Sequence, residues 1–273
     1  MAERGEAPAD AAGGGGGGGG GDGGATASGA PRSAVGDVAA QQAAIKKWAV
    51  RPLSEIRAAA KRGDATAQFM LGSAYDFGDL GLAVDHAQAA VWYRKAATAG
   101  LAKAQFNLGS LYERGKGVVQ DAAEAARLYR LAADQGDHKA IFNLGVHYRD
   151  GSGVPQDHAA AFAHFRRAAE LGHLGAMAEL ARCYQDGEGT AVDYAQAMRW
   201  ARRAADQGDA GTMSTVGLLH DNGQGVPQDN AEAIRWYERA AAAGSETAAN
   251  NLRIDARSGV EAARAALRRL GLE

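Results

Sequence analysis

The chain has few of the residues that support several common classes of protein. It contains one cysteine, Cys183, among 273 residues, which excludes an internal disulfide framework and a cysteine-rich zinc site. The 30 lysines and arginines are balanced by 32 aspartates and glutamates, so the basic surface of a general nucleic-acid binder is not expected. No apolar run is long enough to span a membrane, so no membrane association is expected.

The beginning of the chain lacks the features of a targeting segment. Acidic residues occur early, and no apolar stretch follows them, so we expect neither a signal peptide nor a transit peptide and assign a cytoplasmic location by default. An unbroken glycine run extends from Gly13 to Gly21. Because glycine has no side chain to bury and loses much backbone entropy on folding, we expect residues 1–36 to form a disordered Gly-rich tail.

A segment of the form Phe-x-Leu-Gly-x-x-Tyr recurs along the rest of the chain. Complete copies contain Gly72, Gly109 and Gly145, and degenerate copies continue at the same phase. The copies step by about 36 residues, which is typical of repeats that consist of two helices. Apolar residues follow helical spacing, only five prolines occur in the whole chain, and no alternating strand pattern is present. The sequence therefore predicts an all-α repeat array.

Each unit contains signals for two helices, which we name helix A and helix B. Helix A follows a glycine suited to end the previous helix and a capping residue such as Asp64 or Asp137. The glycine inside helix A is small enough to let a partner helix approach closely. Helix B follows a loop with two glycines and carries large side chains followed one turn later by paired alanines. The aspartates expected to cap helix B are Asp85, Asp121, Asp157, Asp193 and Asp229.

The complete pattern, Ala-x-x-x-Leu-Gly-x-x-Tyr-x-x-Gly-x-Gly-Val followed by Ala-x-x-Trp-Tyr-x-x-Ala-Ala, resembles the Sel-one-like repeat (SLR) family, a relative of the tetratricopeptide repeat (TPR). The resemblance covers residues 64–256. It implies a right-handed α-solenoid of antiparallel helix pairs that acts as a non-catalytic adaptor or scaffold for other proteins. We expect residues 37–63 to form an N-terminal capping helix or half-repeat, and residues 257–273 to form a C-terminal capping helix. Ala181 and Arg253 depart from the pattern by replacing its glycine.

If tetratricopeptide geometry applies, helix A lines a concave groove that would bind a peptide segment. Two neighbouring columns of helix A would face this groove, one aromatic and one rich in amides, which can donate to and accept from a peptide backbone. The candidate residues are Phe69, Met70, Phe106, Asn107, Phe142, Asn143 and Glu179. The alternative is that the three phenylalanines complete the core between repeats.

No recognisable catalytic motif occurs, so we expect no enzymatic activity, cofactor or metal. His147 and Cys183 share one column of successive repeats, but Leu111 and Leu219 occupy it elsewhere, which favours core packing over metal binding. Two other functions stay open: a module that stacks end to end, and, remotely, a hydrolase of the kind associated with cysteine-rich relatives. The expected state is a monomer that binds a protein or peptide.

The arginine pairs of helix B form the remaining charged feature of the sequence. Arg166 and Arg167 lie near Glu170, and Arg202 and Arg203 lie near Asp206. We interpret these pairs as parts of a solvated face of mixed charge rather than as a docking patch.

Overall fold

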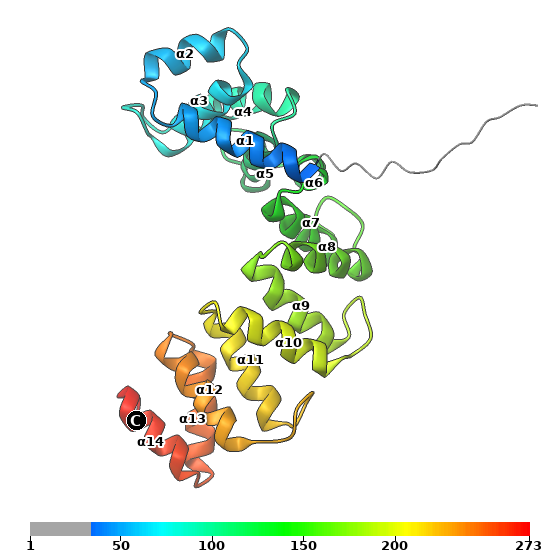
Figure 1. Ribbon diagram of the computed structural model, residues 1–273, viewed down its shortest axis with the longest axis vertical. Helices are drawn as coiled ribbons and strands as arrows, with labels where there is room; N and C mark the ends of the chain where they lie inside the picture. Colours follow the sequence, from blue (N-terminus) through cyan, green and yellow to red (C-terminus); the bar gives the residue numbers. More distant parts are fainter. Residues whose placement is uncertain (1–33) are drawn as a thin grey trace, which may run out of the picture. The chain divides into compact units, whose positions relative to one another are not determined.

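The computed structural model describes residues 34–273, with side chains from residue 40 onward, and all regular secondary structure in this part is helical (Figure 1). The predicted disordered tail lies largely outside the described residues. The helices are α1 (Ala34–Trp48), α2 (Leu53–Lys61), α3 (Ala65–Phe77), α4 (His86–Thr98), α5 (Ala102–Arg114), α6 (Ala122–Asp134), α7 (His138–Asp150), α8 (His158–Glu170), α9 (Leu174–Asp186), α10 (Tyr194–Ala205), α11 (Ala210–Asp221), α12 (Asn230–Ala242), α13 (Glu246–Arg257) and α14 (Glu261–Leu270). The first helix starts at Ala34, slightly before the expected boundary at residue 37.

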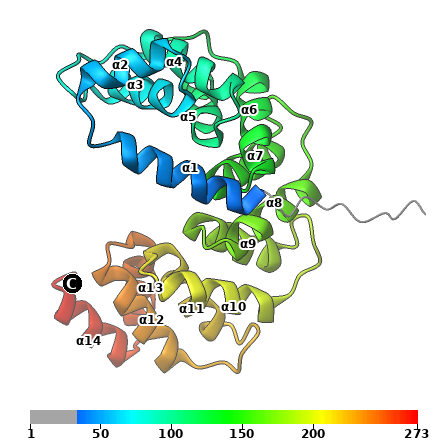
Figure 2. The same ribbon diagram turned by 45° about the horizontal axis from the view of Figure 1, so that its top comes forward.

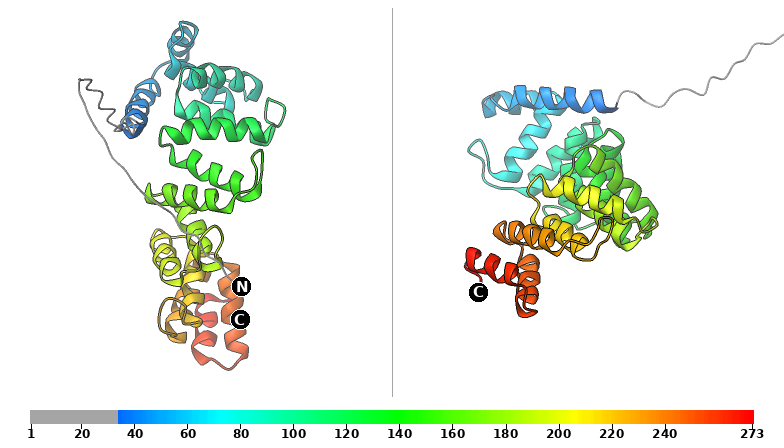
Figure 3. Two further views of the ribbon diagram at one scale, coloured as in Figure 1. Left: turned by 90° about the vertical axis from the view of Figure 1, so that its right-hand side faces the viewer. Right: turned by 60° about the horizontal axis from the view of Figure 1, so that its bottom comes forward.

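From α3 onward the helices form hairpins that pack in series, so the predicted α-solenoid is confirmed. Helix A and helix B of each unit pack together as α3 with α4, α5 with α6, α7 with α8, α9 with α10 and α11 with α12. Each helix B also packs against the next helix A, as the stacked hairpins in the left view of Figure 3 show. The helix α2 packs on α3 before the first hairpin, and α14 packs on α12 and α13 after the last one.

Capping aspartates start eight of the eleven helices from α3 to α13, including every helix B as the sequence predicts, whereas α5 starts at Leu101 without a side-chain cap and α13 is capped by Ser245. Asp85 accepts a hydrogen bond from the backbone N–H of Gln88 at 2.9 Å, and the equivalent aspartates of the other helices B make the same contact. At α9 the cap is His173, whose Nδ1 accepts from the N–H of Ala176 at 3.1 Å. This imidazole cap was not predicted, because histidine is not among the residues preferred at that position.

A contact between glycine and an aromatic ring sets the distance between the two helices of a hairpin. A Cβ atom added at Gly72 would lie 2.7 Å from the ring of Tyr93, and one added at Gly145 would lie 2.8 Å from the ring of Phe165. The pairs Gly109 with Tyr129 and Gly217 with Tyr237 repeat this arrangement. The predicted close approach is therefore confirmed.

The exception at Ala181 follows the same rule. In the fourth unit, helix B carries Ala201 in the column that otherwise holds the ring, and both alanines are buried. Without a ring in this column, helix A can accommodate a methyl group. The departure from the repeat pattern is therefore a compensating pair of substitutions.

A second contact of glycine joins successive units. In the second to fifth units, the second glycine of the loop after helix A has a positive φ and lies against the backbone at the start of the preceding helix B. A Cβ at Gly153 would lie 2.2 Å from the carbonyl of Ala122. Gly117, Gly189 and Gly225 make the corresponding contacts with the backbone of His86, His158 and Tyr194. No residue with a side chain fits at these positions without moving one repeat away from the next.

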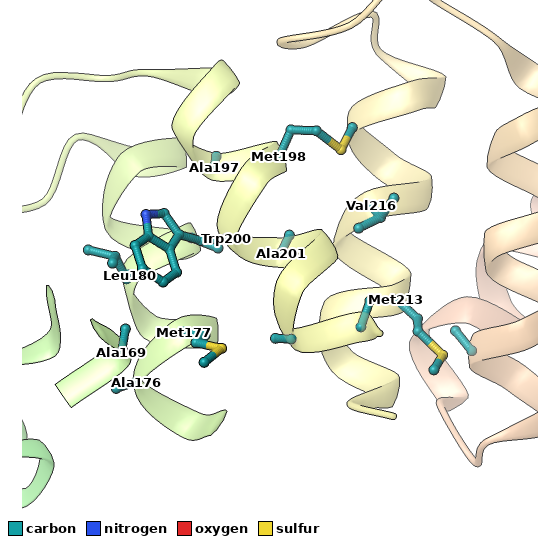
Figure 4. Packing of buried hydrophobic residues seen from close by; sticks show 14 of the residues in the cluster. Ala169, Ala176, Met177, Leu180, Ala197, Met198, Trp200, Ala201, Met213 and Val216 are labelled. Atoms are coloured by element: carbon teal, nitrogen blue, oxygen red, sulfur yellow. The ribbon is translucent and has the colours of Figure 1, made fainter. Parts of the chain in front are cut away.

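The core fills the space between neighbouring hairpins with large side chains and alanines. Figure 4 shows Trp200 pointing from α10 toward Leu180 of α9, while Met198 and Val216 lie between α10 and α11. Burial of each large side chain contributes about 1.5–3 kcal/mol. Among the described helices, none has the length and apolar character needed to cross a lipid bilayer.

We expect Gly145→Ala to have opposite effects on stability in two backgrounds. In the natural chain the new methyl meets the Phe165 ring, which should lower the free energy of unfolding by about 1–3 kcal/mol. In a Phe165→Ala background the ring is absent, and the higher helix propensity of alanine should raise that free energy by up to about 1 kcal/mol. Chemical denaturation of the four proteins of this double-mutant cycle measures the coupling.

The control for this cycle is Ala181→Gly, which faces no ring and should cost only about 1 kcal/mol of helix propensity. Equal effects of Gly145→Ala in both backgrounds would contradict the proposed ring contact.

Candidate peptide-binding face

The helix α1 covers the first positions of the predicted groove. It packs against α3 (Figure 2), and the Gln41 side chain accepts a hydrogen bond from the N–H of Ala102 at 3.0 Å and donates one to Gln135 at 2.9 Å. Ile45 of α1 packs against the apolar cluster that contains Phe69, whose exposed fraction is only 7%. The groove candidate Phe69 is therefore part of the core.

The phenylalanine column packs its rings against the large residues of helix B. Phe106 lies 5.6 Å from Tyr129 and Phe142 lies 5.8 Å from Phe165, measured between ring centroids, and both phenylalanines are half-buried. Phe142 is also stacked on His173 at 4.4 Å. The column thus contributes to the core between helices, and it exposes part of a ring at Phe106 and Phe142.

The amide column connects each unit to the buried tyrosine of the preceding one. Asn107 donates from Nδ2 to the hydroxyl oxygen of Tyr93 at 3.0 Å, and that hydroxyl donates to the Asp76 carboxylate at 3.2 Å. Asn143 and Asn251 occupy the same column near Tyr129 and Tyr237, and each amide acts to lower the pKa of its tyrosine against the larger effect of burial. Burial, with the nearby Asp76 carboxylate, raises the pKa of Tyr93, so its hydroxyl keeps its proton.

The fourth unit shows why this column changes. The helix B of the third unit, α8, carries Phe165, which has no hydroxyl, and the helix A of the fourth unit, α9, carries Glu179 instead of asparagine. The Glu179 carboxylate accepts from Arg149 at 2.9 Å and from Arg182 at 3.1 Å. This groove candidate is therefore held in an ion-pair network between α7 and α9, and it is half-buried.

A hollow of about 330 Å³ opens between α3, α5 and α7 beside these columns. Apolar surface comes from Phe77, Phe106 and Leu111, and the amides of Asn107 and Asn143 lie at its wall. Phe77 is 65% exposed, which is unusual for a phenylalanine. The remaining lining residues are Asp76, His86, Ser110, Arg114 and Lys116.

This hollow combines an apolar floor with polar groups of both signs. Asp76 accepts a hydrogen bond from Tyr93 and is 3.0 Å from Nδ1 of His86, so its carboxylate already has hydrogen-bond partners within the fold. Arg114 makes no ion pair within residues 40–273. Such a site can receive an apolar side chain and bond the peptide groups on either side of it.

Of the predicted groove residues, the structure brings three to this hollow: Phe106, Asn107 and Asn143. Met70 is half-buried near α1, Phe142 stacks on His173, and Glu179 lies two units away. Sequence reasoning missed Phe77. Its position at the end of helix A is held by Arg114 and Asp150 in the next two units, so the apolar exception itself was the available signal.

The pair of His147 and Cys183 does not form a metal site among the described residues, which contain no group of three or more potential ligands. Burial raises the pKa of the Cys183 thiol to about 11, so the sulfur stays protonated near neutral pH. His147 instead pairs with Glu113, with 3.4 Å between Nε2 and Oε1, and its Nδ1 lies 2.7 Å from the carbonyl oxygen of Ser152.

These features define a helical-repeat protein with an extended face on its helices A. The five hairpins match the Sel1 repeat at residues 65–101, 102–137, 138–173, 175–209 and 213–245, so the chain belongs to the Sel1 repeat (SLR) family. Members of this family are typically protein-interaction scaffolds rather than enzymes.

Two solved structures illustrate the relationship. A protective antigen of uropathogenic Escherichia coli with an SLR fold is 33% identical, with a TM-score of 0.73, over 78% of this chain and 47% of that one. This chain thus spans about half the length of that antigen. A Sel1 repeat protein from Oxalobacter formigenes is 34% identical, with a TM-score of 0.67, over 71% of this chain and 79% of that one. None of the curated proteins matches this chain.

We expect His147→Leu to remove part of the pH dependence of stability. Burial alone would lower the pKa of His147, but Glu113 and the Ser152 carbonyl outweigh it and raise this pKa above its ordinary 6.5. Because folding raises this pKa, protonated His147 adds to the free energy of unfolding. This contribution is fully present below pH 6.5 and is lost as the pH rises through the folded-state pKa. The hydrogen bond from His147 lowers the pKa of Glu113 below its ordinary 4.5, so the contribution of Glu113 is already present above pH 4.5.

The natural protein should therefore lose more stability than the variant between about pH 5.5 and pH 8.5, by a few degrees in Tm. Leucine fits this column, as Leu111 and Leu219 show, so the variant should fold. Thermal unfolding at both pH values measures the difference. The same change in Tm for both proteins would show that the His147–Glu113 pair does not contribute.

Proposed function

We propose that this protein is a non-catalytic adaptor that binds an extended peptide segment of a partner protein across its helices A. The hollow beside Phe106 is the anchor for an apolar side chain of that segment. The observation that carries this proposal is the exposure of Phe77 at the same hollow as the half-buried Phe106, because exposed aromatic surface in a hollow is stabilised when a ligand covers it.

The polar groups around the hollow support a peptide rather than a wholly apolar ligand. The carbonyl oxygen of Asn107 and the side chains of Ser110 and Arg114 supply an acceptor, a hydroxyl and a cation within the same hollow. A peptide passing over it presents both N–H and C=O groups, which these side chains match. Amides at this face thus bond both to the repeat core and to a ligand.

End-to-end assembly is supported less well by the C-terminal helix. Arg268 of α14 pairs with Glu261 at 2.9 Å, and Arg269 pairs with Glu238 of α12 at 2.6 Å. These exposed charges would have to be desolvated at a stacking interface, at a cost in free energy. We therefore expect sedimentation equilibrium to show a monomer at all protein concentrations. Association that increases with protein concentration would favour end-to-end assembly.

We expect peptides selected from a random phage-displayed library on the intact chain to share an apolar anchor residue. Phe77→Ser and Ser110→Arg should each lower the affinity for a synthetic copy of a selected peptide by about tenfold or more. The first substitution removes apolar contact, and the second fills the hollow. Isothermal titration calorimetry measures both affinities. Phe77 is exposed, so its replacement should leave the Tm nearly unchanged.

The matched control is Ile254→Ser, which removes a similarly exposed apolar side chain from helix α13, outside the hollow. It should leave peptide affinity unchanged. Selected peptides that bind all three variants as well as they bind the natural chain would place the binding site elsewhere and overturn the proposal.

A further inference from the structure

Charge is distributed unevenly between the two kinds of helix. The five helices B, which are α4, α6, α8, α10 and α12, carry eleven lysines and arginines against five aspartates and glutamates. The helices α3, α5, α7, α9, α11 and α13 carry seven against eight. In a chain with a net charge of −2, positive charge is thus concentrated along the bodies of the helices B, beyond the capping aspartates at their starts.

Most of this positive charge has no carboxylate partner within residues 40–273. All eleven basic side chains are exposed, and only Arg127 and Arg235 form ion pairs, with Glu124 and Glu232. The arginine pairs expected to lie in a mixed-charge face, Arg166–Arg167 and Arg202–Arg203, make no ion pair with Glu170 or Asp206. The cations therefore remain available to a ligand.

Aromatic residues hold many of these cations in place. Lys95 lies 4.2 Å from the ring centroid of Trp92, and Arg239 lies 4.2 Å from that of Trp236. Arg94 and Arg130 donate to the hydroxyl oxygens of tyrosines in the next unit, at 2.6 and 2.9 Å. An arginine stacked on a ring keeps its edge N–H groups free for a carboxylate, and it loses less entropy on binding because it is already ordered.

The densest part of this surface lies on α10 and α12. Arg203 lies 5.1 Å from the ring of Trp200, and Arg202 of α10 reaches over Trp236 of α12 at 5.9 Å. Arg199 and Arg239 extend the group, and α10 contains no acidic residue. Four cations thus surround two buried indoles across the boundary between two repeats.

The other end of the surface offers apolar hollows between its cations. One, of about 600 Å³, is lined by Val91, Arg94 and Lys95. Another, of about 490 Å³, is lined by Leu128 and Leu131 together with Arg94 and the Arg127–Glu124 ion pair. Val91 and Leu131 are substantially exposed, so these hollows can receive aliphatic side chains.

We propose that the helix-B surface is a second docking site, separate from the helix-A hollow, which binds an acidic protein segment that also carries aliphatic residues. Charge complementarity selects the carboxylates, and the two hollows beside α4, one of which also borders α6, take the apolar side chains. Nucleic acid fits less well, because a capping aspartate stands at the start of every helix B and would face a continuous phosphate backbone. The two sites together would let one chain join two partners.

The test uses the full chain and a fluorescent peptide of repeated Glu-Glu-Leu units, measured by anisotropy at about 0.05 M salt, where surface charges are screened little. We expect saturable binding that weakens as salt is added, and no binding of the Gln-Gln-Leu counterpart. This comparison needs no variant of the protein, so its result does not depend on any substitution being tolerated. Equal binding of both peptides, or binding of neither, would overturn the proposal.

One triple variant replaces three cations of this group by glutamine: Arg202→Gln, Arg203→Gln and Arg239→Gln. Its affinity for the acidic peptide should be about tenfold lower than that of the natural chain, since each surface charge contributes modestly. The control Lys61→Gln, Lys139→Gln and Arg257→Gln removes the same charge elsewhere and should stay within about twofold. Equal losses in both triples would show attraction by net charge only. Tighter binding of single-stranded DNA than of the peptide would favour nucleic acid and overturn the assignment.

Discussion

The close approach of helix A to helix B, set by a contact between glycine and an aromatic ring in four of the five hairpins, is the constraint on which the rest of this structure depends. It brings helix A against helix B so closely that a methyl group at Gly72, Gly109, Gly145 or Gly217 would overlap a ring. The loop glycines then fix each hairpin on the one before it. Since every repeat touches only its neighbours, these two local contacts determine the spacing and orientation of all the repeats. The faces that carry the proposed sites follow from them.

The repeat pattern was sufficient to predict the helices, their caps and the role of the inner glycine, because each of these depends on residues close in sequence. The sequence could not indicate how helix A is rotated, and a change of one position decides whether Phe69 faces a groove or the core. Nor could it show that Asn107 bonds to Tyr93, although both residues belong to visible columns, because that contact joins two units. The position of α1, which covers the first repeat, depends on contacts with residues more than 60 positions away. Long-range contacts of this kind leave no periodic signal.

The two faces of the array differ in what they present to a partner. The helix-A face offers a hollow with the exposed ring of Phe77 and the half-buried ring of Phe106, which suits the apolar anchor of a peptide. The helix-B face offers ordered cations separated by aliphatic hollows. Because the rings that order the cations are also buried between hairpins, the same tryptophans stabilise the array and shape the surface. An adaptor needs two separate surfaces, and this division of the helices supplies them.

The spacing of the repeats depends on the contacts of glycine both inside and between hairpins, and hydrogen–deuterium exchange on Gly153→Ala tests the contact between hairpins most directly. Gly172→Ala is the matched control, because both glycines have a positive φ but a Cβ at Gly172 would contact nothing within 4 Å. The account predicts faster amide exchange throughout α6 and α7 in Gly153→Ala, and only a local change beside residue 172 in the control. Exchange in α6 and α7 that is the same in both variants would contradict it.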